Sequence, residues 1–240
     1  MPVSDIRHQT ILGVSADTDW VAEELLFPGA PQLTIPKLDN ETRDYRFTLR
    51  GTGADTLVRD LGIRRSEQRL SSRNGQSVVL LVTRALGSVL PIFSDSALVV
   101  QRTLSPLSEM MQSGSTVSHF EYAGAKVRLR VTKPDSADVT AEHTYEVPVF
   151  HFNELDLVIR SIPLRAGYRA ILPLYSEGTD VLEMDSVRVE GKTPAGAWHV
   201  RFADPAIVMT YELDATTREI LSQEVFQRKS RRKVTRVAVP

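Results

Sequence analysis

Apolar and polar residues alternate with a period of two along much of the chain. Residues 126–131, 197–202 and 207–213 each place apolar side chains on one face and charged or hydroxyl side chains on the other. Such alternation is typical of strands in an antiparallel sheet that has one face in the core and one in water. Residues 78–82 are apolar without interruption, which predicts a strand covered on both faces.

Turn residues separate these segments at the distances of β-hairpins. Asn74-Gly75 lies between two strand-like segments and predicts a tight turn. Glycine-rich and Asp/Thr-rich turns join the later segments, so residues 97–226 predict a meander of successive hairpins. A parallel α/β fold is disfavoured because the strands alternate with turns and not with helices of about 10–15 residues.

One segment has helical spacing. Apolar residues at i, i+3, i+4 and i+7 predict an amphipathic helix over residues 153–162. Asn153 is expected to cap its start, with Asp156 returning a hydrogen bond. Pro163 is expected to end it, because proline disfavours helical geometry at the preceding residue. A second short helix is predicted over residues 54–61.

These patterns predict a mainly β fold, a curved antiparallel sheet or open half-barrel with the short helix packed across it. We expect a single β-rich domain over residues 1–240. Residues 1–50 contain four prolines and predict a wrapping arm or edge strands. Residues 227–240 predict a basic C-terminal strand or tail.

Composition excludes several classes of protein. The 240 residues carry 29 Lys and Arg against 30 Asp and Glu, which argues against broad neutralisation of nucleic-acid phosphates. A hydrophobic content of 42% argues against long-range disorder. Without cysteine there is no disulfide, thiolate metal site or cysteine nucleophile.

No long apolar stretch predicts a transmembrane helix, and the first residues do not read as a signal peptide. The expected location is therefore the cytoplasm if the sequence is complete, or the cell envelope if a leader was removed.

A further pattern extends from Pro148 towards residue 226. It comprises Pro148-Val149-Phe150-His151-Phe152-Asn153, Ile162-Pro163-Leu164, Gly167-Tyr168, Gly196-Ala197-Trp198-His199-Val200 and Tyr211-Glu212-Leu213-Asp214. With it, residues 97–226 resemble the bacterial envelope proteins catalogued as domain of unknown function 3108. The resemblance implies a fold similar to the half-barrel of lipoprotein carriers, a periplasmic location and an apolar ligand, and it implies no catalytic residue.

Aromatic residues fall on the inward faces of the predicted strands. They are Tyr168, Tyr175, Trp198, Phe202 and Tyr211. In a closed sandwich they would form core, whereas in a half-barrel some would line an apolar pocket. Trp198, Tyr211, Tyr168 and Phe202 are the predicted ligand-binding residues.

The C-terminal run of cations is the strongest local charge feature. Its predicted contacts with an anionic membrane surface are Arg228, Lys229, Arg231, Arg232 and Lys233, with Arg236 following. The alternative is an edge strand or tail whose charge prevents edge-to-edge pairing. Nucleic acid is not an expected partner, because no aromatic residue between Arg228 and Arg236 could stack on a base.

The sequence gives little support for a catalytic site. The five histidines, His8, His119, His143, His151 and His199, match no compact metal-ligand spacing. Glu183 and Asp185 would share a strand face, although two exposed acids on a solvated strand are the commoner arrangement. We therefore predict no catalytic residue, no metal and no cofactor.

The favoured function is a non-enzymatic binding or carrier module for an apolar ligand, either a lipid or an acylated group. The first alternative is a structural or interaction protein of the cell envelope with a filled core. The second is an unrecognised hydrolase or isomerase.

Overall fold

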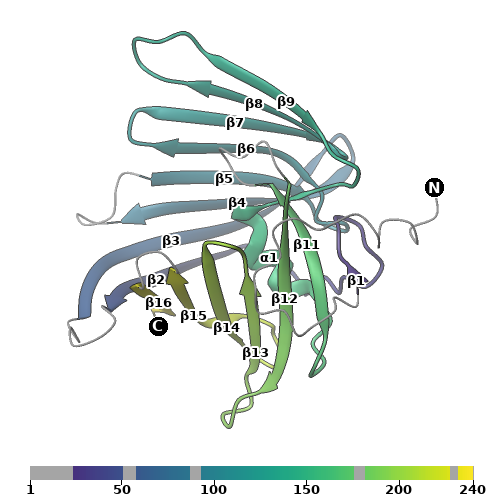
Figure 1. Ribbon diagram of the computed structural model, residues 1–240, viewed down its shortest axis with the longest axis vertical. Helices are drawn as coiled ribbons and strands as arrows, with labels where there is room; N and C mark the ends of the chain where they lie inside the picture. The colour runs from purple at the N-terminus through teal and green to yellow at the C-terminus, as the bar shows by residue number, and fades with distance from the viewer. Residues whose placement is uncertain (1–23, 51–57, 87–92, 176–181, 228–231, 240) are drawn as a thin grey trace.

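The computed structural model describes residues 24–50, 58–86, 93–175, 182–227 and 232–239. Within these ranges sixteen strands form one sheet, accompanied by one short α-helix (Figure 1). The prediction of a mainly β, open antiparallel fold with a single short helix is confirmed, and the sheet does not close into a barrel.

The strands follow one another through the chain with short connections. The first eight are β1 (Glu24–Leu25), β2 (Glu41–Arg50), β3 (Val58–Arg73), β4 (Gln76–Leu86), β5 (Phe93–Val100), β6 (Pro106–Ser113), β7 (Thr116–Ala123) and β8 (Lys126–Thr132). The others are β9 (Val139–Thr144), β10 (Phe150–His151), β11 (Arg169–Tyr175), β12 (Glu183–Lys192), β13 (Trp198–Ala203), β14 (Ile207–Leu213), β15 (Ile220–Gln227) and β16 (Arg232–Ala238).

Two antiparallel meanders build the sheet. Strands β2 to β9 form one and strands β11 to β16 form the other, and β16 joins them by pairing antiparallel with β2. The short strands β1 and β10 pair in parallel with β11. The predicted meander is therefore confirmed, with a helical interruption between β9 and β11.

Figure 1 shows the β2–β9 strands stacked above the β11–β16 strands, with α1 (Leu155–Ser161) between the two halves. Leu155, Leu157, Val158 and Ile159 of the helix are all buried. They join a core that draws residues from both halves, including Val79 of β4 and Phe202 of β13. The helix therefore fills the space that the curved sheet encloses.

The start of the helix differs from the prediction. A 3₁₀ turn, Phe152–Glu154, precedes α1, and its cap is His151 instead of Asn153. The backbone of His151 is extended, its Nδ1 accepts the Asn153 N–H at 3.2 Å, and Glu154 accepts the His151 N–H at 2.8 Å. This reciprocal pair is a capping box formed two residues earlier than expected. The predicted end is confirmed, because Ile162 before Pro163 is extended.

The helix predicted over residues 54–61 is wrong in its described part. Residues from Val58 onward belong to β3, where Val58 pairs with Arg50 and Arg59 with Leu49. Residues 54–57 lie outside the described ranges. Cross-strand pairing with β2 outweighs the local apolar spacing, because it satisfies the backbone of a 16-residue strand.

The terminal segments also differ from expectation. Within residues 1–50, β1 lies at one end of the sheet, but β2 is an interior strand between β16 and β3. The described part of the basic C-terminal segment is a strand, one of the two forms predicted, but β16 lies between β15 and β2 and is therefore an interior strand and not an edge. The turn at Asn74-Gly75 is confirmed, with φ values of 51° and 76° that suit a primed hairpin turn.

Candidate functional site

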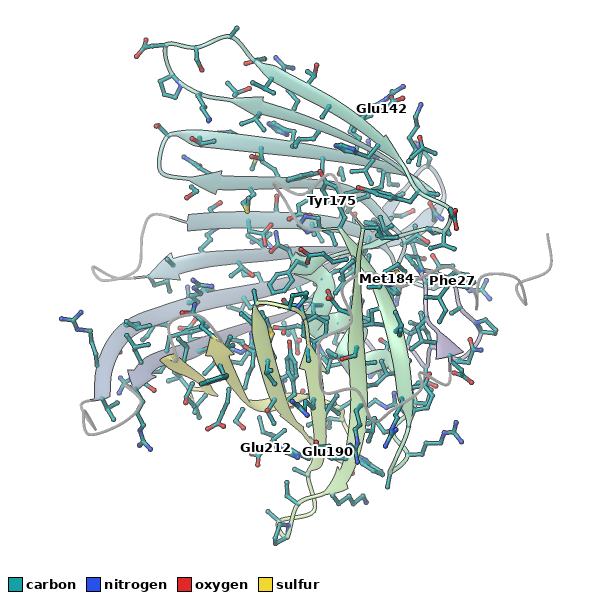
Figure 2. All side chains as sticks on the ribbon, in the orientation of Figure 1. Phe27, Glu142, Tyr175, Met184, Glu190 and Glu212 are labelled. Carbon is teal, nitrogen blue, oxygen red and sulfur yellow. The ribbon has the colours of Figure 1, made fainter. Side chains whose placement is uncertain are left out.

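Aromatic rings join the two ends of the open sheet. Tyr175 at the end of β11 lies edge-on to Phe120 of β7, with ring centres 5.8 Å apart, and 6.2 Å from His143 of β9. His151 of β10 lies 5.1 Å from Phe120. Figure 2 shows Tyr175 where the tip of β11 reaches the upper half of the molecule. We call Phe120, His143, His151 and Tyr175 the aromatic seam.

A buried polar network lies against this seam. One carboxylate oxygen of Glu109 on β6 lies against Nδ1 of His151, and the side-chain amide of Asn153 donates to the other Glu109 oxygen. Asp95 of β5 and Glu154 complete the network, in which Asp95, Glu109, His151 and Glu154 are 1–5% exposed. Polar contacts therefore connect β6 to the β10–helix segment across the core.

Burial changes the protonation of this network. It raises the pKa of Asp95 to about 8, with the charge of Glu109 adding to the effect and that of His151 opposing it. Burial also raises the pKa of Glu154 well above its usual value, despite the hydrogen bond from the His151 backbone. Asp95 is therefore largely protonated at neutral pH, and burial favours the protonated form of Glu154. Because the side chains are almost fully covered, a substrate in solution has no contact with them, and their chemistry is proton sharing inside the core.

The opposite face of the same strands is hollowed. A groove of about 870 Å³ runs across β4–β9, and we call it the β4–β9 groove. Phe120 points towards the seam, so its neighbours His119 and Glu121 point into the groove. Five steps between adjacent strands, at about 4.8 Å each, make the groove about 24 Å long.

The two halves of this groove differ in polarity. Leu80 and Leu98 are half-buried and Met110 is 37% exposed, so β4–β6 present apolar surface. At the other end Arg128 of β8 donates to Glu142 of β9 at 2.6 Å. Figure 2 shows Glu142 on the outermost strand of the upper half. The groove thus passes from an apolar end to a charged end.

A second, smaller hollow lies between α1 and β2–β4. This α1 cavity has a volume of about 60 Å³ and a mainly polar lining. Glu41 lies between two arginines there, 3.3 Å from Arg43 Nη2 and 3.4 Å from Arg160 Nη1. Asn153 also lines it, so the cavity adjoins the buried polar network.

The four predicted ligand-binding residues lie on inward faces, as expected. Phe202 and Tyr211 are fully buried, and Tyr168 is 1% exposed with its hydroxyl donating to Glu24 at 2.8 Å. Trp198 is half-buried, with the Lys192 ammonium 5.2 Å from its ring centre. None of the four is among the described residues that line the groove or the α1 cavity. Their role in ligand binding stays a prediction.

The basic run is only partly described. Arg228, Lys229 and Arg231 lie outside the described residues, while Arg232 and Lys233 belong to β16. Arg236, further along the same strand, is buried and donates to Asp156 of α1 at 2.6 Å. At least this member of the run is therefore a core residue and not a surface cation.

Glu183 and Asp185 share one face of β12, as the sequence predicts, but the expectation of a solvated face is wrong for Asp185, which points inward and is only 2% exposed. Burial raises the pKa of Asp185 to about 8, helped by the charges of Asp204 and Glu183. The described residues contain no group of three or more His, Asp and Glu that could hold a metal ion.

The remaining histidines are dispersed. His119 lines the groove, and His199 Nδ1 lies 2.8 Å from Glu190. His143 and His151 both contact the Tyr175 ring, at 6.2 and 6.0 Å between centres. His8 lies outside the described residues.

Sequence reasoning missed the acidic members of the network. Asp95 and Glu109 each occupy an inward position of an alternating strand, where an apolar residue is expected. Acidic residues at positions where apolar residues are expected could have indicated a buried polar site. The contact of Glu109 with His151 could not be predicted from the sequence, because His151 belongs to a strand that is distant along the chain.

Comparisons with protein-family models, with curated proteins and with solved structures find no match to this chain. The resemblance to the envelope family therefore remains a prediction. Among the described residues, no helix is both long and apolar enough to cross a bilayer.

Proposed function

We propose that this protein is a non-enzymatic binding module that holds an acylated, amphipathic ligand in the β4–β9 groove. The observation that carries the proposal is the division of one continuous groove into an apolar half over β4–β6 and a charged half over β8–β9. An acyl chain would lie on Leu80, Leu98 and Met110, and the polar group would lie beside Arg128 and Arg130.

The dimensions of the groove support this ligand class. Its volume of about 870 Å³ lies within the range of about 300–1,000 Å³ that is usual for small-molecule sites. Its length of about 24 Å, from the spacing of adjacent strands, suits an acyl chain together with its polar group lying across them. Affinity would come from burial of the chain, at about 25 cal/mol per Å² before the costs of ordering are subtracted.

The interior of the sheet supports the same choice of site. The space enclosed by the two halves contains the apolar face of α1 together with Phe202, Tyr211 and Tyr168, all almost fully buried. A ligand among these side chains would have to displace close-packed atoms. The groove needs no such displacement.

The test is a titration of the full chain with a fluorescent long-chain fatty acid. Ser108→Trp places a large ring in the middle of the groove from a half-buried position on β6. Thr210→Trp, on the outward face of β14, is the matched control because Thr210 is equally half-buried and lies outside the groove.

We expect saturable binding that Ser108→Trp weakens at least about tenfold, equivalent to about 1.4 kcal/mol, and that Thr210→Trp leaves unchanged. Equal loss of binding in both variants, or none in either, would refute the groove as the site. Absence of fatty-acid binding in the unmodified chain would refute the ligand class.

A second candidate function, docking of an extended protein segment, is favoured by β9. This strand is the last of the described sheet, has β8 as its one described strand neighbour, and exposes 60% of Val139. Such an edge can pair with an added strand through its backbone groups. The titration separates the two candidates, because strand addition at β9 predicts no saturable uptake of a free fatty acid.

A further inference from the structure

The two ends of the described sheet differ in the length of their last strand. At one end β1 pairs with β11 over only two residues. At the other end β9 is a six-residue strand whose one described strand neighbour is β8, and its register with β8 runs without a shift. Figure 1 shows β9 as the outermost strand of the upper half. A regular edge strand of this kind is a template for the addition of another strand.

The hydrogen bonds between β8 and β9 show which backbone groups of β9 face the edge. The N–H of Tyr145 donates to the carbonyl of Ala125 at 2.9 Å, and these two residues flank the Lys126–Thr144 pair. Lys126 and Thr144 therefore form a non-hydrogen-bonded pair, and the two kinds of pair alternate along an antiparallel ladder. Every second residue of β9 thus directs its N–H and C=O away from β8. These residues are Thr140, Glu142 and Thr144.

The side chains of β9 do not block pairing at this edge. Natural edge strands often carry lysine, proline or a bulge that prevents the addition of a strand. Residues 139–144 read Val-Thr-Ala-Glu-His-Thr, without lysine, arginine or proline. Val139 is 60% exposed, and the β-branched Val and Thr residues favour an extended backbone. The strand is therefore suited to pairing along its full length.

Strand β9 is complementary to itself in one antiparallel register. Paired residues of a ladder share a face, which leaves two registers that pair five residues of β9 in each copy, centred on Ala141 or on Glu142. The register centred on Glu142 places two Glu142 side chains opposite each other, and like charges in that position are destabilising. The register centred on Ala141 places Thr140 opposite Glu142 twice, and both residues direct their backbone groups to the edge.

Both faces of the Ala141-centred register have compatible side chains. On the groove face, the hydroxyl of Thr140 would lie beside Glu142, whose carboxylate is held in its own copy by Arg128 and Lys126. On the opposite face, the exposed Val139 would pack against His143 of the second copy. The pairing thus covers the exposed apolar side chain of the edge and brings no two carboxylates together.

We propose that β9 pairs antiparallel with β9 of a second copy of this chain, with Ala141 on the two-fold axis. The two sheets then form one continuous sheet. This dimer does not depend on the ligand of the β4–β9 groove, because the pairing uses the edge of β9 and the groove lies on the face of the strands. Since the contact is made by a single strand of each copy, the dimer is reversible and its interface is small.

An extended segment of another protein is the competing occupant of the β9 edge. It would use the same backbone groups, but its pairing would not depend on the concentration of this chain. Self-pairing also fixes which side chain lies opposite residue 140, namely Glu142. The two occupants therefore differ in how assembly responds to concentration and to a charge at position 140.

The test is analytical ultracentrifugation of the full chain over a range of concentrations, without added lipid. Thr140→Pro removes an N–H that faces the edge and leaves the hydrogen bonds with β8 in place, since edge strands accept proline at such positions. Thr140→Glu places a carboxylate opposite Glu142 of the second copy, while within its own sheet it lies opposite Arg130. Ser72→Glu is the matched control, because Ser72 is an exposed residue of the interior strand β3.

We expect a monomer–dimer equilibrium that Thr140→Pro and Thr140→Glu each weaken at least about tenfold and that Ser72→Glu leaves unchanged. Thermal unfolding at low concentration shows whether each variant is folded, and Thr140→Glu should keep the midpoint of the unmodified chain because it lies opposite Arg130. A chain that stays monomeric at every concentration, or a dimer that both Thr140 variants retain, would overturn the proposal.

The groove variant Ser108→Trp separates this result from the proposed function. It should weaken fatty-acid binding and leave the dimer unchanged, because Ser108 lies in the groove and not on β9. Failure of fatty-acid binding in a chain that still forms dimers would refute the groove ligand alone. Binding of fatty acid by a chain that is always monomeric would refute the self-pairing alone.

Discussion

The guanidinium of Arg236 on β16 lies 4.6 Å from the centre of the Tyr45 ring on β2 and forms a 2.6 Å ion pair with Asp156 on α1. These contacts connect the C-terminal strand β16, its partner strand β2 and the helix. Burial of Arg236 opposes its charged form, but the charge of Asp156 and its hydrogen bond raise the pKa of Arg236 further. Arg236 therefore remains charged although it is buried.

The first prediction concerns this ion pair. Asp156→Ala leaves the Arg236 guanidinium buried without its partner, so we expect a loss of about 2 kcal/mol in the free energy of unfolding. The value lies below the usual cost because Asp156 is 41% exposed and water can approach the remaining charge. The double variant Asp156→Leu/Arg236→Met removes both charges and should recover most of the loss. Urea unfolding of the three proteins measures this, and a double variant less stable than Asp156→Ala would contradict it.

The second prediction concerns pH and Asp185. Its pKa is about 8 in the folded protein, against an ordinary value of 3.8, so the folded state binds a proton that the unfolded state releases. The stability that this proton provides is complete below about pH 4 and is lost as the pH rises towards 8. Asp185→Asn removes this dependence, because the amide has no proton to lose.

Urea unfolding at several pH values measures the effect of Asp185→Asn. We expect the variant to match the unmodified chain near pH 4 and to exceed its stability at pH 8 by an amount on the order of 1–4 kcal/mol. Asp138→Asn is the control, and it should change the pH dependence of stability in the opposite direction. Arg130 lowers the pKa of Asp138, so that side chain stabilises the fold at higher pH and not at lower pH. Parallel pH profiles for Asp185→Asn and the unmodified chain would show that Asp185 is ionised in the core.

The third prediction compares two aromatic residues of β13. Phe202 is fully buried in the shared core, so Phe202→Ala should cost about 3–5 kcal/mol. Trp198 is half-buried with one face towards the Lys192 ammonium, so Trp198→Ala should cost less, about 1–2 kcal/mol. Denaturant unfolding gives both values. Equal costs would mean that Trp198 packs as deeply as Phe202.

The sequence predicted the fold class because strand periodicity is a local signal. The alternation in β8, β13 and β14 assigns inward and outward faces without knowledge of the neighbouring strands. The turn at Asn74-Gly75 was equally readable, since positive φ selects those residue types. The order of the strands in the sheet could not be predicted from the sequence. The pairing of β16 with β2 brings together the two ends of the described chain, and no local pattern encodes it.

The candidate sites show the same limit. In the sequence Arg236 is one more cation of a basic run, with no indication that it is buried. In the structure the pleat of β16 directs its side chain inward, towards Asp156. His151 reads as an isolated histidine, and only the packing of β10 against β6 brings it to Glu109. The β4–β9 groove depends on how six strands curve together. These features arise from long-range pairing, which single-sequence periodicity does not contain.

The fourth prediction concerns Glu154, whose Oε1 accepts the backbone N–H of His151 at 2.8 Å in the capping box. Burial raises its pKa well above the usual value and so favours the protonated, uncharged side chain. Glu154→Gln keeps a carbonyl oxygen for the same hydrogen bond and should change the free energy of unfolding by less than about 1 kcal/mol. Glu154→Ala leaves the N–H without its acceptor and opens a cavity, and should cost about 2–3 kcal/mol.

The pH dependence of the Gln variant provides the control for this reasoning. Because the folded pKa of Glu154 is raised, its contribution to stability is present at low pH and falls as the pH rises, whereas glutamine contributes equally at every pH. Glu154→Gln should therefore gain relative to the unmodified chain as the pH rises above the ordinary glutamate value of 4.5, as measured by urea unfolding at several pH values. A Gln variant that instead loses stability as steeply as Glu154→Ala would show that Glu154 caps the helix as a carboxylate, with its negative charge retained inside the core.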